Sequence, residues 1–554
     1  MKMLDRREFI KLSTMGSLGL VMGCKPGQDL DLIIKNGLIL DGLGGEGTLA
    51  DIGVRKDRIV VMDKLPQLPA KTIIDARGKV VCPGFIDIHT HTDTELLVNG
   101  KAESKIRQGV TLEIGGNCGS SPFPLNEQAA RDYHGHIKGK YDIDTDWHDL
   151  AGFFDAIEQA GTSINYASLT GQGDLRAFVV GLHDTPPDAD QLKEMQRVLE
   201  RSMEQGSFGL STGLEYAPGS YASTEELIEL TQAVKRFDGL YATHMRNEDD
   251  RVEEAIEEAL RIGRDAGVFT QISHLKACNR NNWHKVDHML EMIATAQQNQ
   301  GVLADRYPYD AWGTGLSAFL PLWARQGDTK EVLARLDNPE DLKKIKEYTE
   351  GRAARIGGWD RVMISSCSYE DDKFCEGLTV LDGANEKNME PFEFVRSLLK
   401  NSNNRVGVVG FAMDEANLHK VLNAEFVMVG SDGTAVAPYG KLATGKPHPR
   451  FYGTFPRVLG KYSRDEKVLP LAQAVKKMTS MPAKSLGIKE RGVLKAGNKA
   501  DIVIFDPETV IDKATFSDPH QYPVGIETVI VNGTITIQGG EHTGALSGEI
   551  VRRT

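Results

Sequence analysis

The chain of 554 residues is poor in cysteine and has no long block of basic residues. Its six cysteines are too few and too scattered for a disulfide framework: Cys24, Cys82, Cys118, Cys278, Cys367 and Cys375. Only Cys367 and Cys375 are close enough in one segment to pair in an oxidising compartment, and a free buried pair is an equal alternative. The formal net charge of −13 argues against a polyanionic partner such as nucleic acid. Small molecules or metal ions fit this composition better.

The first residues have the features of an export signal. Basic residues, including Arg6 and Arg7, precede the uncharged stretch LSTMGSLGLVMG, which is about half the length needed to span a bilayer. The paired arginines resemble a Tat signal, and VMGC, ending at Cys24, resembles a lipobox in which Met22 fits poorly. We expect residues 1–23 to be a signal peptide and the mature protein to be periplasmic or membrane-anchored through a lipidated Cys24. A frayed amphipathic N-terminus is the alternative.

Both ends of the remaining chain are rich in short strand-like runs with Gly-rich turns. DLIIKNGLIL and KTIIDARGKVV are examples near the start, and GNKADIVIFD and GIETVIVNGTITIQ are examples near the end. No helical pattern separates these runs. We therefore predict one small β-sandwich domain assembled from residues 29–81 and 485–554.

Eight apolar runs alternate with amphipathic segments across residues 82–484. The runs are VVCPGFIDIH, TLEIGGNC, INYASLTGQG, SFGLSTGL, LYATHMR, VFTQISHLK, GVLADRYPY and EFVMVGSDG. Eight βα repeats are more typical of a TIM (β/α)8 barrel than of an open sheet, so we predict the α/β class with this barrel. The gap between the seventh and eighth runs, about residues 317–424, is too long for one helix and predicts an inserted subdomain or lid.

Residues that bind metals end several of these runs. His89 and His91 end the first, and because side chains alternate along a strand, both lie on one face. Four other runs end in Cys118, His244, His274 and Asp432. Each alone is more typical of a core residue or an exposed loop, but the carboxyl ends of barrel strands meet at one catalytic face. A thiolate and imidazoles completed by a carboxylate favour zinc over magnesium or calcium.

Seven motifs occur in order across residues 83–460: PGFIDIHTHTD, GVTLEIGGNCG, GSFGLSTGLEYAPGSYASTEEL, YATHMRNED, ISHLKACNRNNW, YPYDAWGTGL and GSDGTAVAPYGKLATGKPHPRFYGTFPRVLG. They resemble the amidohydrolase superfamily and, within it, the N-acyl-D-amino-acid deacylase (D-aminoacylase) family. GVLKAGNKADIVIFDP resembles the closing β-segment of the superfamily. The resemblance implies a metal-dependent hydrolase of linear amides.

The resemblance also implies roles for matching residues. It assigns a tight zinc site to Cys118, His244 and His274, and a weaker second site to His89, His91 and Asp432. Cys118 would replace the bridging carbamylated lysine of related amidohydrolases. The substrate carboxylate would be held by Lys276, Arg450 and Tyr307, with Tyr309 as the alternative to Tyr307. Asp432 would also be the catalytic base and acid.

Two features depart from the family pattern. Gln172 stands where the family commonly has histidine in a Gly-His-Gly stretch, which affects contacts at the third strand. The loop between Asp432 and HPR is longer than in the type enzyme, which makes the placement of Arg450 less direct.

We expect zinc-dependent hydrolysis of the amide bond of N-acyl-D-amino acids, with Arg306 and Trp312 lining the substrate pocket. One alternative is a cyclic-amide hydrolase of the dihydroorotase or hydantoinase type, which shares the His-x-His but prefers a carbamylated lysine. The other alternative is an exported, non-catalytic metal-binding lipoprotein.

Overall fold

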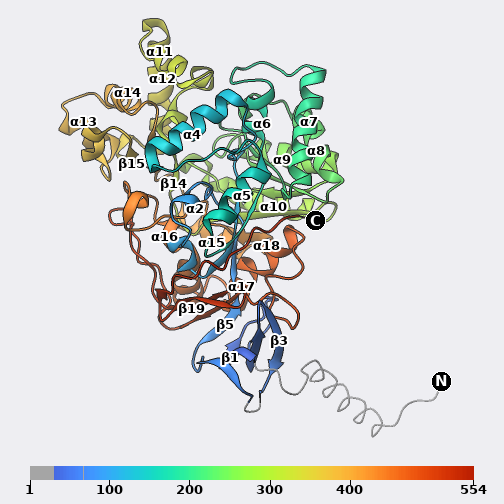
Figure 1. The fold of residues 1–554 in the computed structure, drawn as a ribbon. Helices are drawn as coiled ribbons and strands as arrows, with labels where there is room; N and C mark the ends of the chain where they lie inside the picture. Colours follow the sequence, from blue (N-terminus) through green and yellow to red (C-terminus); the bar gives the residue numbers. More distant parts are fainter. Residues whose placement is uncertain (1–29, 66–67, 554) are drawn as a thin grey trace.

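A computed structural model describes residues 30–65 and 68–553 of the chain (Figure 1). The predicted signal peptide, residues 1–23, and the predicted lipidation site Cys24 lie outside the described residues. Every helix within the described ranges is too short or too polar to span a membrane.

The eight predicted runs form the parallel strands of a barrel, so the predicted fold class is confirmed. The strands are β6 (Phe85–Asp87), β7 (Val110–Gly115), β8 (Asn165–Ser168) continued by β9 (Thr170–Gly171), β10 (Gly209–Gly213), β11 (Leu240–His244), β12 (Phe269–Ile272), β13 (Val302–Arg306) and β17 (Val427–Val429). They are paired in the orders β6-β7-β8 and β9-β10-β11-β12-β13-β17. A parallel bridge between Thr90 and Gly433 joins the first and last strands and closes the barrel.

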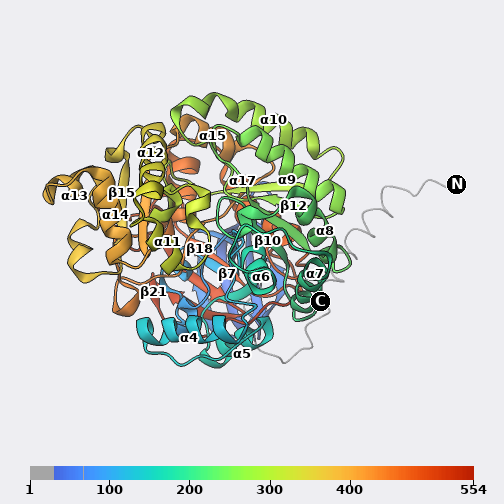
Figure 2. The same ribbon diagram turned by 90° about the horizontal axis from the view of Figure 1, so that it is seen from above.

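Helices surround these strands, as the view from above shows (Figure 2). They include α5 (Leu150–Ala160), α6 (Gln172–Val179), α7 (Ala189–Glu204), α8 (Thr224–Lys235), α9 (Val252–Ala266), α10 (Val286–Ala296), α15 (Glu415–Asn423) and α17 (Leu471–Met478). In α9, Val252, Ile256 and Ala259 recur at helical spacing and are buried against the barrel. Gly267 ends α9 in the left-handed conformation with φ 69°, where glycine carries no steric penalty.

A buried lysine ties three parts of the barrel together. Lys105, in the short helix α3 (Glu103–Ile106), is fully buried. Its Nζ lies 2.9 Å from Asp87 of β6, 3.0 Å from Glu113 of β7 and 2.7 Å from the hydroxyl of Ser431, just after β17. The ammonium group therefore compensates two buried carboxylates on the first two strands and fixes the start of the last loop.

Strands from both ends of the chain form a β-domain at the base of the barrel (Figure 1). They are β1 (Leu30–Ile39), β2 (Thr48–Arg55), β3 (Arg58–Asp63), β4 (Ala70–Asp75), β5 (Val80–Pro83), β18 (Ile502–Phe505), β19 (Ile526–Val531), β20 (Thr534–Gln538) and β21 (Glu541–His542), in one nine-stranded sheet. Antiparallel pairing of β5 with β18 joins the two termini. Because side chains alternate along β18, Ile502 and Ile504 pack inside the β-domain, whereas Val503 and Phe505 pack against the barrel. The β-domain extends through Pro83, two residues beyond the expected boundary.

An inserted lobe lies between β13 and β17. It contains β14 (Trp312–Gly315), α11 (Thr329–Arg335), α12 (Pro339–Ile356), β15 (Val362–Cys367), α13 (Val380–Glu386), α14 (Pro391–Asn401) and β16 (Val406–Gly410). Its antiparallel sheet, ordered β14-β16-β15, covers a separate apolar core that includes Phe392 and Leu398. The lobe thus begins at β14, before residue 317, whereas α15 packs on α10 and β17 as part of the barrel. The length of the gap predicted an insertion, but pairing of β14 with β16 is not visible in the sequence.

Candidate metal centre and substrate pocket

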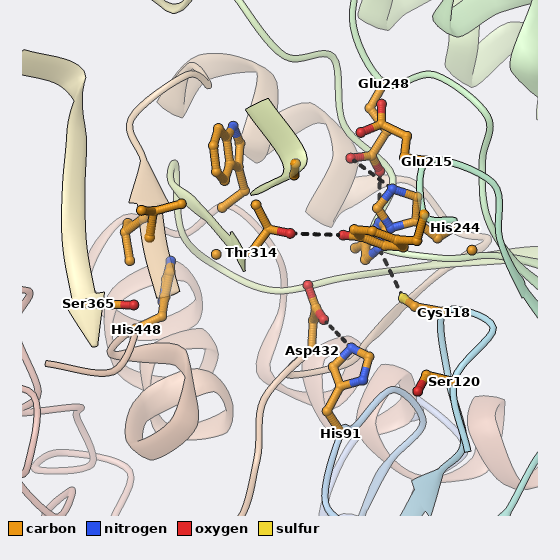
Figure 3. Close-up of a pocket in the computed structure, with 18 of the residues that line it drawn as sticks. His91, Cys118, Ser120, Glu215, His244, Glu248, Thr314, Ser365, Asp432 and His448 are labelled. Carbon is orange, nitrogen blue, oxygen red and sulfur yellow. Dashed lines mark hydrogen bonds and ion pairs between the residues drawn. The ribbon is translucent and has the colours of Figure 1, made fainter. Parts of the chain in front are cut away.

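A cavity of about 660 Å³ opens at the carboxyl ends of the barrel strands (Figure 3). Its lining includes five of the six predicted metal ligands: His91, Cys118, His244, His274 and Asp432. The sixth, His89, is fully buried directly behind them. The strand ends therefore bring all the predicted ligands to one place, although they are separated by up to 343 positions in sequence.

Two sets of donor atoms meet at Cys118. One set is Cys118, His244 and His274, and the other is His89, His91, Cys118 and Asp432, with the ligand atoms of each set within 4.8 Å of one another. Sγ of Cys118 lies 3.2 Å from Nε2 of His89 and 3.5 Å from Nε2 of His274. Oδ1 of Asp432 lies 3.0 Å from Nε2 of His91. Cys118 belongs to both sets, so its thiolate could bind two adjacent ions.

Three of these residues have a backbone conformation that is unfavourable outside glycine. The φ angles of Cys118, His274 and Asp432 are 52°, 36° and 48°. Neighbouring groups hold two of them: the amide of Asp432 donates to the carbonyl of His89 (2.8 Å), and the amide of His274 donates to Asp305 (2.9 Å). Strained residues of this kind are concentrated at functional sites, where the surroundings impose the geometry.

Asp305 orients two of the histidines and was not anticipated from the sequence. Its buried carboxylate accepts from Nδ1 of His89 at 3.0 Å and from the amide of His274, and Gln271 donates to its other oxygen at 2.7 Å. A proton on Nδ1 of His89 leaves Nε2 free to bind a cation. A carboxylate inside the apolar run GVLADRY was the available signal for this residue.

Glu248 has a similar role beside His274. Its Oε1 lies 2.9 Å from Nδ1 of His274 and 2.5 Å from Nζ of Lys276. We infer that Nδ1 of His274 carries a proton and donates it to this carboxylate in a hydrogen bond, which leaves Nε2 to face Cys118. Lys276 lies at the cavity wall, but its ammonium group is paired with Glu248. The position of Glu248, four residues after a strand-end histidine, was a signal that sequence reasoning missed.

The charges of the centre suit a cation. Burial opposes ionisation of Cys118, but His89 and His274 outweigh it and hold the pKa of the thiol well below its usual value. Burial also opposes ionisation of Asp432, whereas Arg450 and His91 hold its pKa well below the usual carboxyl value. Both groups are therefore anionic near neutral pH, the state in which a thiolate or a carboxylate binds a cation.

The surroundings of the His244 ring indicate whether these residues fit a metal ion. His244 is 4% exposed, and neither ring nitrogen has a hydrogen-bond partner among the described residues, since Oε2 of Glu248 lies 3.8 Å from Nε2, beyond hydrogen-bond distance. A buried imidazole normally satisfies at least one nitrogen, so this arrangement is the one expected of a metal ligand. A thiolate with two imidazoles, next to two further imidazoles and a carboxylate, fits zinc by donor chemistry.

Residues predicted to bind the substrate carboxylate converge beside this centre. Lys276, Tyr307 and Arg450 all line the cavity. Nη1 of Arg450 lies 3.0 Å from Oδ2 of Asp432, and its guanidinium carbon lies 4.6 Å from the ring centroid of Tyr307. The buried hydroxyl of Tyr307 has no hydrogen-bond partner within residues 30–65 and 68–553. Tyr309 lies elsewhere, with its hydroxyl 3.2 Å from Asp512, so the structure places Tyr307, not Tyr309, in the cavity.

Of the two further pocket residues expected from the sequence, Trp312 lines the cavity and Arg306 does not. The expectation for Arg306 was wrong because its guanidinium stacks under the ring of Tyr307 at 4.1 Å and donates to the carbonyl of Tyr309 at 2.8 Å. Gln172 is fully buried beside the cavity residue Gly173, and its amide has no hydrogen-bond partner among the described side and main chains. Gln172, which stands where the family commonly has histidine, therefore lies behind the cavity wall.

A (β/α)8 barrel with histidine, cysteine and aspartate donors at its strand ends defines the class of metal-dependent barrel hydrolases. A family model described as "Amidohydrolase family" matches residues 72–304 and 417–537. D-aminoacylase of Alcaligenes xylosoxydans xylosoxydans is 35% identical over 530 residues, which cover 95% of this chain and 98% of that protein. N-acyl-D-glutamate deacylase of the same organism is 35% identical over 512 residues, covering 91% and 93% of the two chains.

Solved structures agree with these relatives. A crystal structure of D-aminoacylase has a TM-score of 0.79 and covers 95% of this chain and 100% of its own, and another structure of D-aminoacylase concerns its binuclear metal centre, with one-metal activation and second-metal attenuation. The N-acyl-D-glutamate deacylase of Bordetella bronchiseptica, 33% identical with the same TM-score and coverage, is complexed with zinc and a phosphonate mimic of the tetrahedral intermediate. The chain belongs to the amidohydrolase family and, within it, to the N-acyl-D-amino-acid deacylases.

Proposed function

We propose that the protein is a zinc-dependent enzyme that hydrolyses N-acyl-D-amino acids to a carboxylate and a free D-amino acid. The observation that carries this proposal is the position of Asp432. One of its oxygens lies 3.0 Å from the metal donor His91, and the other lies 3.0 Å from the carboxylate-binding Arg450. A substrate carboxylate at Arg450 therefore brings the adjacent amide close to the metal donors.

The proposed tight zinc ligands are Cys118, His244 and His274, and the proposed weaker site is formed by His89, His91 and Asp432. Support comes from the donor types and from the relatives whose structures contain zinc or a binuclear centre. When bound, zinc supplies Lewis-acid chemistry: it lowers the pKa of water and polarises a carbonyl group.

Residues of the chain carry out the remaining steps. Arg450 and the hydroxyl of Tyr307 bind the α-carboxylate, with Lys276 adding positive charge at the same end. Asp432 accepts a proton at its carboxylate from the attacking water and returns it to the amide nitrogen as the C–N bond breaks. The new C–O bond completes the carboxylate product, and the D-amino acid leaves with its amine. Asp432 is thus ligand, base and acid in turn.

A panel assay tests this proposal directly. Purified protein loaded with zinc should hydrolyse N-acetyl-D-amino acids, with release of the free amine as the readout. Hydrolysis of dihydroorotate or a hydantoin in preference to linear amides would assign the protein to the cyclic-amide hydrolases. Zinc binding without hydrolysis of any of these compounds would favour a non-catalytic lipoprotein.

We also propose export through the Tat route, with the protein periplasmic or anchored at Cys24. The basis is the sequence of the first residues, with Arg6 and Arg7 before an uncharged stretch. A reporter fused to residues 1–30 should leave the cytoplasm, and changing both arginines to lysine should stop it. Unchanged export of the paired-lysine variant would point to the Sec route.

A further inference from the structure

The inserted lobe supplies one wall of the cavity. We call this surface the lobe wall and define it by Trp312, Ile356, Ser365, Ser366, Val408 and Val409. These residues come from β14, from the end of α12, and from β15 and β16. All six have neutral side chains, and four of them are apolar. The lobe adds one charged residue to the lining of the cavity, Arg352, which is paired with Glu215 at 3.2 Å. The lobe wall therefore offers contact to uncharged groups.

The lobe wall lies next to the end of the cavity that binds the carboxylate. A methyl group added at Gly313 would lie 3.6 Å from Nη2 of Arg450, so β14 passes directly beside the guanidinium group. The amide of Arg450 donates to Nδ1 of His448 at 3.1 Å. Burial and the nearby Arg450 hold the pKa of His448 well below its usual value, which leaves this imidazole neutral. A substrate whose α-carboxylate binds Arg450 would have its α-carbon close to β14, and we therefore place its side chain against the lobe wall.

Each lysine or arginine in the lining of the cavity already has a carboxylate partner. Arg352 of α12 lies 3.2 Å from Glu215, and the partners of Lys276 and Arg450 are Glu248 and Asp432. Arg450 is also the proposed ligand of the α-carboxylate. Lys276 and Arg450 are taken by the α-carboxylate in the proposed function. An acidic substrate side chain would therefore have to displace Glu215 from Arg352 to gain an ion pair, and would otherwise lose hydration without compensation.

We infer that the lobe wall is the side-chain specificity site of this enzyme and that it selects D-amino acids with neutral, mainly apolar side chains. This inference rests on the proposed function. It names the substrate class within that function. Desolvation of a charged side chain without a partner is costly, so the preference for neutral over charged substrates should be at least about tenfold in kcat/KM.

The test compares zinc-loaded enzyme on the N-acetyl derivatives of D-leucine, D-methionine, D-alanine, D-glutamate and D-lysine. Higher kcat/KM for D-leucine and D-methionine than for D-glutamate and D-lysine is the expected result. Preference for D-glutamate or D-lysine would overturn the inference and leave the proposed function intact. If none of the five is hydrolysed, the proposed function itself fails.

A pair of tryptophan variants locates the effect. Trp312→Ala removes apolar contact area from the lobe wall and should lower kcat/KM for N-acetyl-D-leucine by about tenfold, with a smaller loss for N-acetyl-D-alanine. The control Trp323→Ala changes a tryptophan of the same lobe that is 38% exposed and lies outside the cavity lining, so both substrates should keep their rates. Equal loss on both substrates in Trp312→Ala would show that this residue does not set side-chain preference.

A second, independent observation concerns the two cysteines of the lobe. Cys367 ends β15 and Cys375 ends the 3-10 helix η7 (Glu370–Cys375). Their sulfur atoms lie 3.7 Å apart, and the side chains are almost fully buried, at 5% and 0% exposure. A disulfide requires a sulfur–sulfur separation of about 2.05 Å, so the two sulfur atoms would have to move closer together for the bond to form. Ser365 and Ser366 of the lobe wall immediately precede this pair.

We propose that Cys367 and Cys375 form a disulfide when the chain folds in an oxidising compartment. The S–S bond forms by thiol–disulfide exchange: an oxidised dithiol protein accepts two electrons, and both thiol protons are released to its sulfurs or to solvent. The bond would tie η7 to the strand that supplies Ser365 and Ser366. This proposal does not depend on the substrate.

Trypsin provides a sharp test because Lys373 lies between the two cysteines. The chain is secreted into a bacterial periplasm behind an established export signal, alkylated under denaturing conditions and digested. The peptides on either side of Lys373 should stay joined until reductant is added, whereas Cys278 should be alkylated. Alkylation of both Cys367 and Cys375, in protein collected from the periplasm, would overturn the proposal. Cys375→Ser is the control that cannot form the joined peptide.

Discussion

Asp432 and Arg450 form a buried ion pair, with Oδ2 of the carboxylate 3.0 Å from Nη1 of the guanidinium and the side chains 9% and 5% exposed. The other oxygen of Asp432 faces His91. One carboxylate therefore links the proposed metal donors to the proposed substrate clamp, and a change at either end alters the position of the proposed base.

Replacement of Asp432 by asparagine keeps the size of the side chain but removes its capacity to accept a proton. We expect kcat to fall by about 10²-fold or more, while the tight zinc ion stays bound. Steady-state kinetics and metal analysis of the purified variant measure both. Asp174→Asn is a matched control, since Asp174 lines the cavity outside both donor sets. Near-normal turnover by Asp432→Asn would assign the base to another group.

Cys118→Ala should abolish both activity and tight zinc binding, because a site with one of three ligands removed holds the ion poorly. His244→Ala should do the same. Cys278→Ala is the control: this buried cysteine also lines the cavity but belongs to neither donor set, so its zinc content should match the wild type. Full zinc content in an inactive Cys118→Ala protein would give Cys118 a different role.

Arg450→Ala removes a charge-assisted contact that positions the amide, so kcat/KM should fall by about 10²-fold or more. Zinc should stay in place. Arg450→Lys keeps the charge but loses the planar fork, and it should recover only part of the rate. Full activity of the alanine variant would place the substrate carboxylate elsewhere.

The enzyme should prefer D- over L-substrates by at least about a hundredfold in kcat/KM. The α-carboxylate and the acyl group are each fixed at one place, so the L-enantiomer must direct its side chain away from the lobe wall. Rates on paired N-acetyl-D- and N-acetyl-L-leucine measure this ratio. Comparable rates would contradict the proposed substrate while leaving the metal site untouched.

Lys105→Met should destabilise the folded protein by about 3–5 kcal/mol, because Asp87 and Glu113 would stay buried without their cation. Thermal or chemical unfolding detects the change. Lys101→Met is the control, since Lys101 is exposed in the adjacent segment. A variant of Lys105 as stable as the wild type would mean that the two carboxylates accept protons at little cost.

The barrel and the convergence of the six candidate metal donors could be predicted because each relevant side chain ends an apolar run, and the ends of parallel strands meet. His89, Cys118 and Asp432 were found in this way. Their orienting partners could not be found so easily, because Asp305 and Glu248 act through contacts with residues on other strands. Nothing in the sequence states which histidine a given carboxylate will face.

Arg306 shows that being next to a cavity residue in the sequence does not place a side chain in the cavity. It precedes a cavity residue in the chain, yet successive side chains of a strand point to opposite sides, so Tyr307 faces the cavity and Arg306 packs beneath it. The start of the lobe was missed for a related reason. Trp312 begins a strand whose partner, Gly410, lies almost a hundred positions later in the chain.

The lobe leaves the barrel after β13 and returns before β17, and these two strands are direct neighbours in the sheet. The residues matched by the family model stop at 304 and resume at 417, on either side of the lobe. The barrel can therefore accept a different lobe without changing its own strand pairing, because the two strands that flank the insertion pair with each other. Recombination at these two junctions offers evolution, and protein engineers, a way to alter which substrates are accepted while the hydrolytic centre is inherited intact.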